Sequence, residues 1–310
     1  MDRRFKAWTM PGMEDLGSAL GVGTVIDGEV VRNRSWERDV FMCFDLLSVE
    51  RESVVRVPLQ QRLKRLQQDI LGQRYLKYLT AHDETVDMRM KTLPLIMKHF
   101  YPTKQVGEVL RHIGPEGSDR VYLEKSQEGK PNPSRKRHHK SDGLIFAPNL
   151  PYHRGTDFNY MKWKWHDTIT LDFEATRSFS AKYGVAVAFD AQDSKVDFTE
   201  HIVLSPQEKY RLLGDLGQQN MIITEWEYSP SEGAWVYKMP RPDKKKSNFA
   251  RTVLSTMMEL AEAMDVEEVE YRLSFSNPEE DNWEVANKAK RTEMVAARRR
   301  GAKANGGAAH

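Results

Sequence analysis

The sequence contains a single cysteine, Cys43, and therefore cannot form an internal disulfide. A chain without disulfides fits a reducing compartment such as the cytosol or the nucleus. No stretch approaches the roughly 18 consecutive apolar residues that a membrane-spanning helix needs, and the first residues lack the apolar core of a signal peptide. Positive and negative residues are nearly balanced, and the formal net charge is only +2. We therefore expect no membrane partner, and the overall charge does not indicate a polyanionic one.

Hydrophobic residues make up 39% of the 310 residues and charged residues 30%, which is typical of a globular chain with a buried core. The length exceeds the usual size of one domain, so we expect two. The expected divisions are a first domain over 1–166, a second over 167–247, a C-terminal helix with an extension over 248–276, and a basic, disordered tail over 277–310.

The first domain is expected to begin with two neighbouring strands over 24–31 and 40–47, both rich in β-branched and aromatic residues. A helix should follow from Pro58, because Leu59, Leu63, Leu66 and Ile70 fall on one helical face that can dock on the sheet. Residues 127–140 are polar, basic and contain proline, so they predict an exposed loop.

The second domain shows short strand-like segments over 168–173, 184–189, 221–228 and 234–238. A small β-barrel is the simplest arrangement of such strands. Helical spacing of apolar residues over 248–264 then predicts an amphipathic helix, with Ser247 as its candidate N-cap.

Basic residues gather at 135–140, 244–246 and 288–303. The last segment holds seven positive residues against one acid, Glu293. Such clusters are most often solvated surface, and contact with nucleic acid is the alternative.

The segment YMKWKW at 160–165 is the most informative local pattern. Alternation along a strand places Lys162 and Lys164 on one face, and Trp163 and Trp165 on the other, toward the core. Two ammonium groups on one face suit a phosphate chain. An ordinary amphipathic strand, with the tryptophans inward and the lysines in water, explains the hexapeptide equally well.

Three carboxylates are candidates for a metal ion or a ribose hydroxyl. Asp27 and Glu29 share a strand face by the same alternation, and Asp142 precedes an apolar strand. Taken alone, an Asp-Gly turn beside a solvated acid accounts for the first two, and a simple turn accounts for Asp142.

Five segments together resemble the motifs of covalent nucleotidyltransferases. They are VIDGEVV at 25–31, FMCFDLL at 41–47, SDGLIF at 141–146, MKWK at 161–164 and RPDK at 241–244, and they follow the family order. The flanking residues resemble the branch of mRNA capping enzymes over about residues 2 to 264. Five short motifs in the correct order are far more specific than any one of them.

The resemblance implies an α+β fold in which a nucleotidyltransferase domain of the DNA-ligase and capping-enzyme type, ATP-grasp-like and built of antiparallel sheets and helices, precedes an oligonucleotide-binding (OB) β-barrel. It implies that Glu29 contacts the ribose or a metal ion, that Phe44 stacks on guanine, and that Asp142 helps to hold metal. Lys162 and Lys164 would contact the α-phosphate.

On the barrel, Arg241, Asp243 and Lys244 would close over the β- and γ-phosphates. The implied activity is GTP:RNA guanylyltransferase, in which GMP passes from GTP to a lysine and then to the diphosphate 5′ end of nascent mRNA. Mg²⁺ or Mn²⁺ would be the metal. The nucleus, the C-terminal repeat domain of RNA polymerase II and an RNA triphosphatase are the location and protein partners that the resemblance implies.

The sequence departs from the family in its first motif, Lys-x-Asp-Gly, which carries the nucleophile and should precede the third motif, the one that VIDGEVV at 25–31 resembles. Residues 1–24 lack it, so we expect the chain to start inside the domain and to hold no nucleophilic lysine. Lys140 in KSDG follows the third motif, and we assign it to the loop. Two alternatives stay open, an ATP-dependent polynucleotide ligase and a non-catalytic fragment that binds RNA or the polymerase tail.

Overall fold

The computed structural model describes residues 13–82, 93–124, 137–155, 157–177, 184–189, 194–217, 219–229, 231–262, 264–274 and 283. The chain divides into two compact units between Trp163 and Lys164. The expected tail, 277–310, lies outside the described residues except for Trp283, and so does most of the expected loop, at 125–136.

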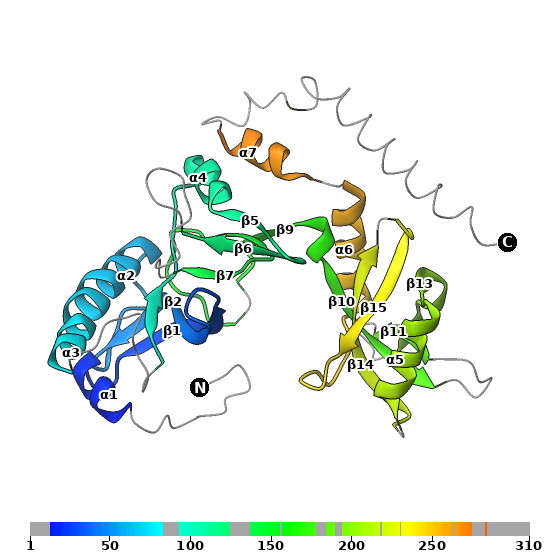
Figure 1. Ribbon diagram of the computed structural model, residues 1–310. Coiled ribbons are helices and arrows are strands. Elements are labelled where there is room, and N and C mark those ends of the chain that lie inside the picture. Colours follow the sequence, from blue (N-terminus) through cyan, green and yellow to red (C-terminus); the bar gives the residue numbers. More distant parts are fainter. Residues whose placement is uncertain are drawn as a thin grey trace. The chain divides into compact units, whose positions relative to one another are not determined.

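The first unit is built on a four-stranded sheet (Figure 1). Strands β1 (Val25–Asn33) and β2 (Arg38–Val49) are antiparallel, as the sequence predicts. The short strand β3 (Glu52–Ser53) turns back after β2 and pairs antiparallel with its end. Strand β4 (Leu95–Met97) pairs with β2 in parallel. The parallel pairing is a departure from the expected antiparallel sheets.

Strand β2 contains two irregularities that matter for the site. The residue pairing with β1 passes from Cys43 directly to Asp45, and from Leu46 directly to Ser48. Phe44 and Leu47 are therefore the extra residues of two β-bulges, which locally re-aim side chains. Strand β1 has no extra residue, so Asp27 and Glu29 keep the predicted alternation along it.

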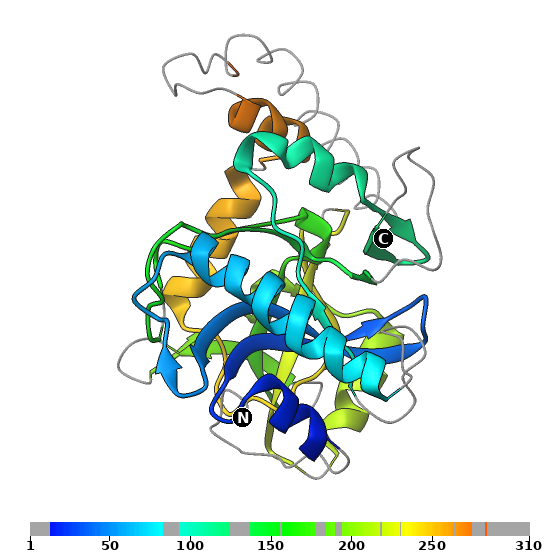
Figure 2. The ribbon, with the colours of Figure 1, turned by 90° about the vertical axis from the view of Figure 1, so that its left-hand side faces the viewer.

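Helices cover one face of this sheet. Helix α1 (Glu14–Leu20) is followed in sequence by β1 and β2, and then by a continuous helical rod formed by α2 (Leu59–Arg65), the π-helix η1 (Leu66–Tyr75) and α3 (Leu76–Ala81). Figure 2 shows this rod lying across β1 and β2. The predicted apolar face is confirmed, because Leu59, Leu63, Leu66 and Ile70 are all buried.

The core beneath the rod also buries Cys43. Burial raises the pKa of the Cys43 thiol to about 12, so the side chain is an inert part of the core at neutral pH.

The rest of the first unit consists of smaller elements. The 3₁₀ helix η2 (Thr103–Gln105) and helix α4 (Val106–Arg111) lead into a three-stranded antiparallel sheet of β5 (Ile113–Glu116), β6 (Asp119–Leu123) and β7 (His138–Lys140). Residues 138–140 are thus a strand, not the end of the expected loop, because β6 supplies the pairing edge. Strands β8 (Gly143–Phe146) and β9 (Met161–Lys164) form a two-stranded sheet.

The second unit is built on a six-stranded sheet with the order β12-β11-β10-β14-β15-β13. After the 3₁₀ helix η3 (His166–Thr168) come β10 (Thr170–Arg177), β11 (Gly184–Phe189), β12 (Lys195–Asp197), η4 (Thr199–His201), β13 (Ile202–Val203), β14 (Met221–Ser229) and β15 (Ala234–Pro240). The four expected strands are confirmed. Pairing between the described strands runs in one path and does not close into a barrel.

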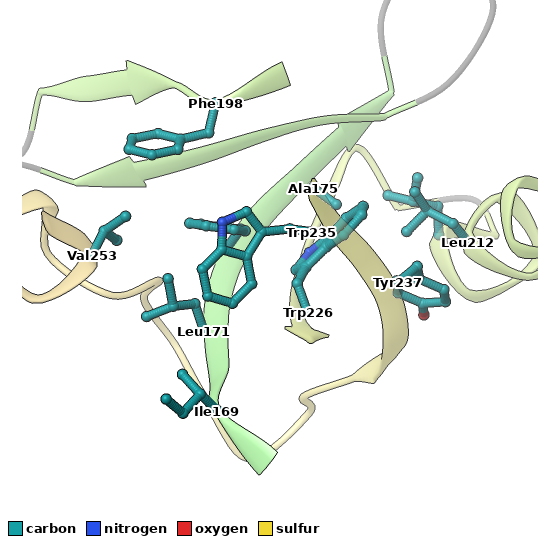
Figure 3. Close-up of a cluster of buried hydrophobic side chains, with 11 residues drawn as sticks. Ile169, Leu171, Ala175, Phe198, Leu212, Trp226, Trp235, Tyr237 and Val253 are labelled. Carbon is teal, nitrogen blue, oxygen red and sulfur yellow. The ribbon is translucent and has the colours of Figure 1, made fainter. Parts of the chain in front are cut away.

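The core of the second unit is aromatic (Figure 3). Phe173, Trp226 and Trp235 are fully buried, and the Phe173 ring meets the Trp235 ring edge-on with the centroids 6.1 Å apart. Leu212 of helix α5 (Pro206–Leu216) and Val253 of helix α6 (Ala250–Glu262) complete this cluster. Both helices therefore pack into the same aromatic core as the sheet.

Helix α6 confirms the amphipathic helix expected over 248–264, although it starts later. Ser247 does not cap it. The backbone N–H of Asp172 donates to the Asn248 side chain, and the N–H of Asn248 donates to the Asp172 carbonyl, so the residues before the helix are held on β10. A further helix, α7 (Val266–Ser274), was not expected separately. Among the described residues, no helix is long and apolar enough to cross a membrane.

Candidate functional site

The first unit brings two charged side chains together across strand β2. Lys98 follows β4 directly, and its backbone N–H donates to the Cys43 carbonyl at 2.7 Å. Its Nζ atom lies 3.2 Å from Oε1 of Glu29 on β1. Glu29 and Lys98 therefore come from the two strands that flank β2.

Phe44 joins this pair. The Lys98 ammonium lies 5.8 Å from the centroid of the Phe44 ring, which is within the range of a cation–π contact. Because Phe44 is the extra residue of a bulge, its side chain is set by the irregularity and not by regular alternation. Glu29, Phe44 and Lys98 form the cluster that we call the Lys98 cluster.

Lys98 is the member that sequence reasoning missed. It follows the three-residue apolar segment LIM, and a lysine after so short a strand gives no distinctive signal. Only the parallel pairing of β4 with β2 carries it next to Glu29 and Phe44.

A histidine lies close to the cluster from another sheet. His139 on β7 packs with its ring edge-on to Tyr122, with the centroids 5.5 Å apart. Its Nδ1 atom is buried and has no hydrogen-bond partner among the described residues. Burial, reinforced by the positive charge of Lys98, lowers the pKa of His139 to about 4, so the imidazole is neutral at pH 7.

Asp27 makes separate contacts. One carboxylate oxygen accepts from the backbone N–H of Gly28 at 3.0 Å, and the other accepts from the Tyr152 hydroxyl at 3.3 Å. Its neighbour on β2, Asp45, forms a buried bidentate ion pair with Arg62 at 2.7 and 2.8 Å. The Arg62 guanidinium also donates to the carbonyls of Val57 and Leu150 and so holds the connection after β8.

Asp142 lies at an exposed position between β7 and β8. Within the described part of the chain, no group of three or more His, Cys, Asp or Glu side chains is arranged to hold a metal ion. Lys140, in contrast to the expected loop position, ends strand β7, where its Nζ lies 2.7 Å from Asp119.

Strand β9 contains both Lys162 and Lys164, as the alternation argument requires. Lys162 is exposed, and Lys164 is partly buried. Trp163 and Trp165 were expected in the core, but both are only partly buried, and Trp165 lies just after the end of β9.

Arg241 sits in the second unit, directly after β15, among three carboxylates. It contacts Asp172 at 3.1 Å, Glu225 at 2.8 Å and Asp243 at 2.9 to 3.0 Å, and Lys244 lies 3.5 Å from Asp172. The Arg241 guanidinium lowers the pKa of Asp243 to about 2. The three residues predicted from the RPDK motif therefore share one ion-pair network, in which Arg241 is already neutralised.

The Lys98 cluster has the chemical groups of a small-molecule site. An aromatic ring can stack on a planar base, an ammonium can donate to a carbonyl oxygen, and a carboxylate can accept from a hydroxyl or bind a cation. Lys162 is exposed on β9, and a lysine ammonium there is a donor suited to phosphate.

Comparison with known proteins agrees with the resemblance to capping enzymes. No family model matches the chain. The mRNA-capping enzyme subunit alpha of Neurospora crassa is 23% identical over 325 aligned residues, which cover 92% of this chain and 74% of that protein. The resemblance to capping enzymes that the five motifs indicate is thus confirmed by a relative that matches nearly the whole chain.

Two solved structures were also found. The ligase domain of LigD from M. tuberculosis has a TM-score of 0.25 at 17% identity, with 72% of this chain and 74% of that chain covered. A mycobacterial DNA ligase D complexed with ATP and MES has a TM-score of 0.30 at 16% identity, with 76% and 78% covered. TM-scores this low do not establish a shared fold.

Proposed function

We propose that this chain is the guanylyltransferase part of an mRNA capping enzyme, which transfers GMP from GTP to the diphosphate 5′ end of nascent RNA. The observation that carries the proposal is similarity to a capping-enzyme subunit over 92% of the chain, with five motifs in family order. In this proposal the first unit is the nucleotidyltransferase domain and the second is the OB domain.

The base would be recognised by the Lys98 cluster. A purine stacked on Phe44 would have its edge within reach of the Lys98 ammonium, which lies 5.8 Å from the ring centroid. Guanine presents two acceptors on one edge, N7 and O6, whereas adenine presents an acceptor and an N–H₂ donor. A lysine donor therefore favours GTP over ATP, and this argues against the ligase alternative.

Glu29 and Asp142 would serve the ribose and the metal. Mg²⁺ is commonly bound through one or two carboxylates together with substrate phosphates and water, a role that these two side chains could fill. When bound, Mg²⁺ or Mn²⁺ would neutralise phosphate charge. Glu29 would exchange its contact with Lys98 for the incoming ligand, leaving Lys98 to the base.

The phosphates would be held by lysines and by the RPDK motif. Lys162 and Lys164 would donate to the α-phosphate, where charge develops in the transition state. Arg241 and Lys244 would move to the β- and γ-phosphates on closure, which requires them to leave Asp172 and Glu225. Asp243 would stay with Arg241 and orient it.

The reaction would run through lysyl-GMP, and the nucleophile would come from a Lys-x-Asp-Gly motif that this sequence does not contain in the required order. The nucleus would be the site of action. The polymerase II repeat domain and an RNA triphosphatase would be partners in the same process.

Labelling separates the candidates. The chain is incubated with α-labelled GTP or α-labelled ATP and divalent metal, alone and with a grafted upstream segment that supplies Lys-x-Asp-Gly, and is then analysed on a denaturing gel. We expect no labelled protein from the chain alone, GMP labelling of the grafted chain, and transfer of that label to diphosphate-ended RNA. Replacing Lys140 with Ala should change nothing.

Labelling from ATP in place of GTP would move the chain to the ligase class. A band from the chain alone that disappears with Lys140→Ala would show that Lys140 is the nucleophile. If the grafted chain binds RNA but takes no label from either nucleotide, the non-catalytic alternative is supported.

A further inference from the structure

The connection between β8 and β9 presents an aromatic side chain to solvent. Phe158 is 91% exposed, the highest value for any large hydrophobic side chain in the part of the chain that the structure describes. Tyr160 and Met161 beside it are also exposed. Exposed apolar groups that gather in one segment indicate an interaction surface.

Phe158 stands on a hydrogen-bonded turn. The backbone N–H of Tyr160 donates to the Asp157 carbonyl at 3.3 Å, and the Asn159 backbone and side-chain amides donate to one Asp157 carboxylate oxygen at 2.9 and 2.8 Å. The turn therefore fixes the backbone that carries the exposed Phe158 side chain.

The start of the connection is tied to the rest of the first unit. Arg62 donates to the Leu150 carbonyl at 3.1 Å, and the N–H of Tyr152 donates to the Val55 carbonyl at 2.8 Å. A platform that is already ordered loses little conformational entropy when a ligand packs on it.

Basic residues flank Phe158 in the sequence. Arg154 and Lys162 are exposed, and neither makes an ion pair with any described residue. The acid in this stretch, Asp157, is engaged by Asn159. Aromatic rings interleaved with cations are the combination that binds single-stranded nucleic acid, because bases stack on the rings and phosphates meet the cations.

We propose that Phe158 is a stacking platform for a base near the 5′ end of the acceptor RNA, with Arg154 contacting an adjacent phosphate. This inference rests on the proposed function, which brings RNA to Lys162. Lys162 lies four positions after Phe158, so their Cα atoms lie at most about 14 Å apart. A few stacked nucleotides can cover that distance. Stacking on Phe158 would not select a particular base.

The experiment measures binding of a short single-stranded RNA with a 5′ diphosphate and 2-aminopurine near that end. We expect wild type to quench 2-aminopurine fluorescence. Phe158→Ala and Phe158→Leu should bind about tenfold more weakly without quenching, and Phe158→Trp should restore both. Arg154→Ala should keep the quenching and lower the slope of log K against log salt by about one.

Tyr210→Ala is the matched control, because Tyr210 on α5 is 81% exposed and lies in the second unit. It should bind RNA like wild type. The proposal is wrong if Phe158→Ala binds RNA with full affinity, if Phe158→Leu retains binding as a generic apolar contact would, or if wild type binds no RNA. GTP affinity, measured on the same proteins, should not depend on Phe158. If the wild-type protein stacks the RNA base on Phe158 but binds no GTP, the proposed function is contradicted and the stacking platform is not.

Discussion

The Lys98 ammonium and the Glu29 carboxylate lie 3.2 Å apart, although 68 residues separate them in the sequence and neither is on the strand between them. The parallel strand β4 and the antiparallel strand β1 bring them to the same side of Phe44. In the proposed function, this contact would give the dispersed motif residues a platform for a base, a donor and an acceptor.

Replacement of Lys98 with Ala should weaken GTP binding by about ten- to a hundredfold, since a charge-assisted hydrogen bond contributes about 1.5–3 kcal/mol. The side chain is partly exposed, so the midpoint of unfolding should move little. Lys77→Ala, at an exposed position on α3, is the matched control for charge. Calorimetric titration with GTP checks the prediction, and equal affinities for the two variants would remove Lys98 from the site.

Replacement of Arg62 with Ala should destabilise the protein by about 3–5 kcal/mol, because it leaves the Asp45 carboxylate buried without its partner. The control is Arg65→Ala, which breaks the exposed Arg65–Asp69 pair and should cost less than about 0.5 kcal/mol. Chemical denaturation gives both values. Similar costs for the two variants would mean that the Arg62–Asp45 pair is no more important than a surface one.

Acid should destabilise the protein partly through His139. Its pKa is about 4 in the folded state and about 6.5 unfolded, so the unfolded state binds more protons between these values. Above pH 6.5 the neutral His139 does not lower the free energy of unfolding. As the pH falls below 6.5 the free energy of unfolding decreases, and by pH 4 about 3 kcal/mol is lost. His139→Phe should flatten the stability curve in that window, whereas the exposed His153→Phe should not. A wild-type slope in His139→Phe would contradict the assignment.

The two faces of β9 should give separate phenotypes. Lys162→Ala should leave the unfolding free energy within about 0.5 kcal/mol, because the side chain is exposed, and should slow GMP transfer by the grafted chain about a hundredfold. Trp235→Ala, in the core of the second unit, should cost about 3–5 kcal/mol. Trp163→Ala should fall between them. A Trp163 cost equal to that of Trp235 would restore the fully buried position expected from the sequence.

Sequence patterns predicted the long elements well. Strands β2, β10 and β14 and helices α2 and α6 follow from period-two and helical spacing, since each buries apolar residues, and β1 follows from its β-branched residues. The strand that carries Lys162 and Lys164 was also predictable, because alternation alone fixes which residues share a face.

What could not be predicted depends on contacts between distant segments. The bulge at Phe44 and the pairing of β4 with β2 have no local signature, so Lys98 was missed. The strand at 138–140 was expected as loop, because its polar residues gain their pairing only from β6. The carboxylates around Arg241 come from three different segments, and spacing could not assemble them.

The most direct test of the account is a comparison of GTP and ATP binding to the chain as it stands. Calorimetry with Mg²⁺ should give GTP an affinity at least tenfold above that of ATP, and Lys98→Ala should remove most of the difference, because guanine O6 loses its donor. Equal affinities for the two nucleotides, or tighter binding of ATP, would contradict the guanine site and with it the proposed guanylyltransferase.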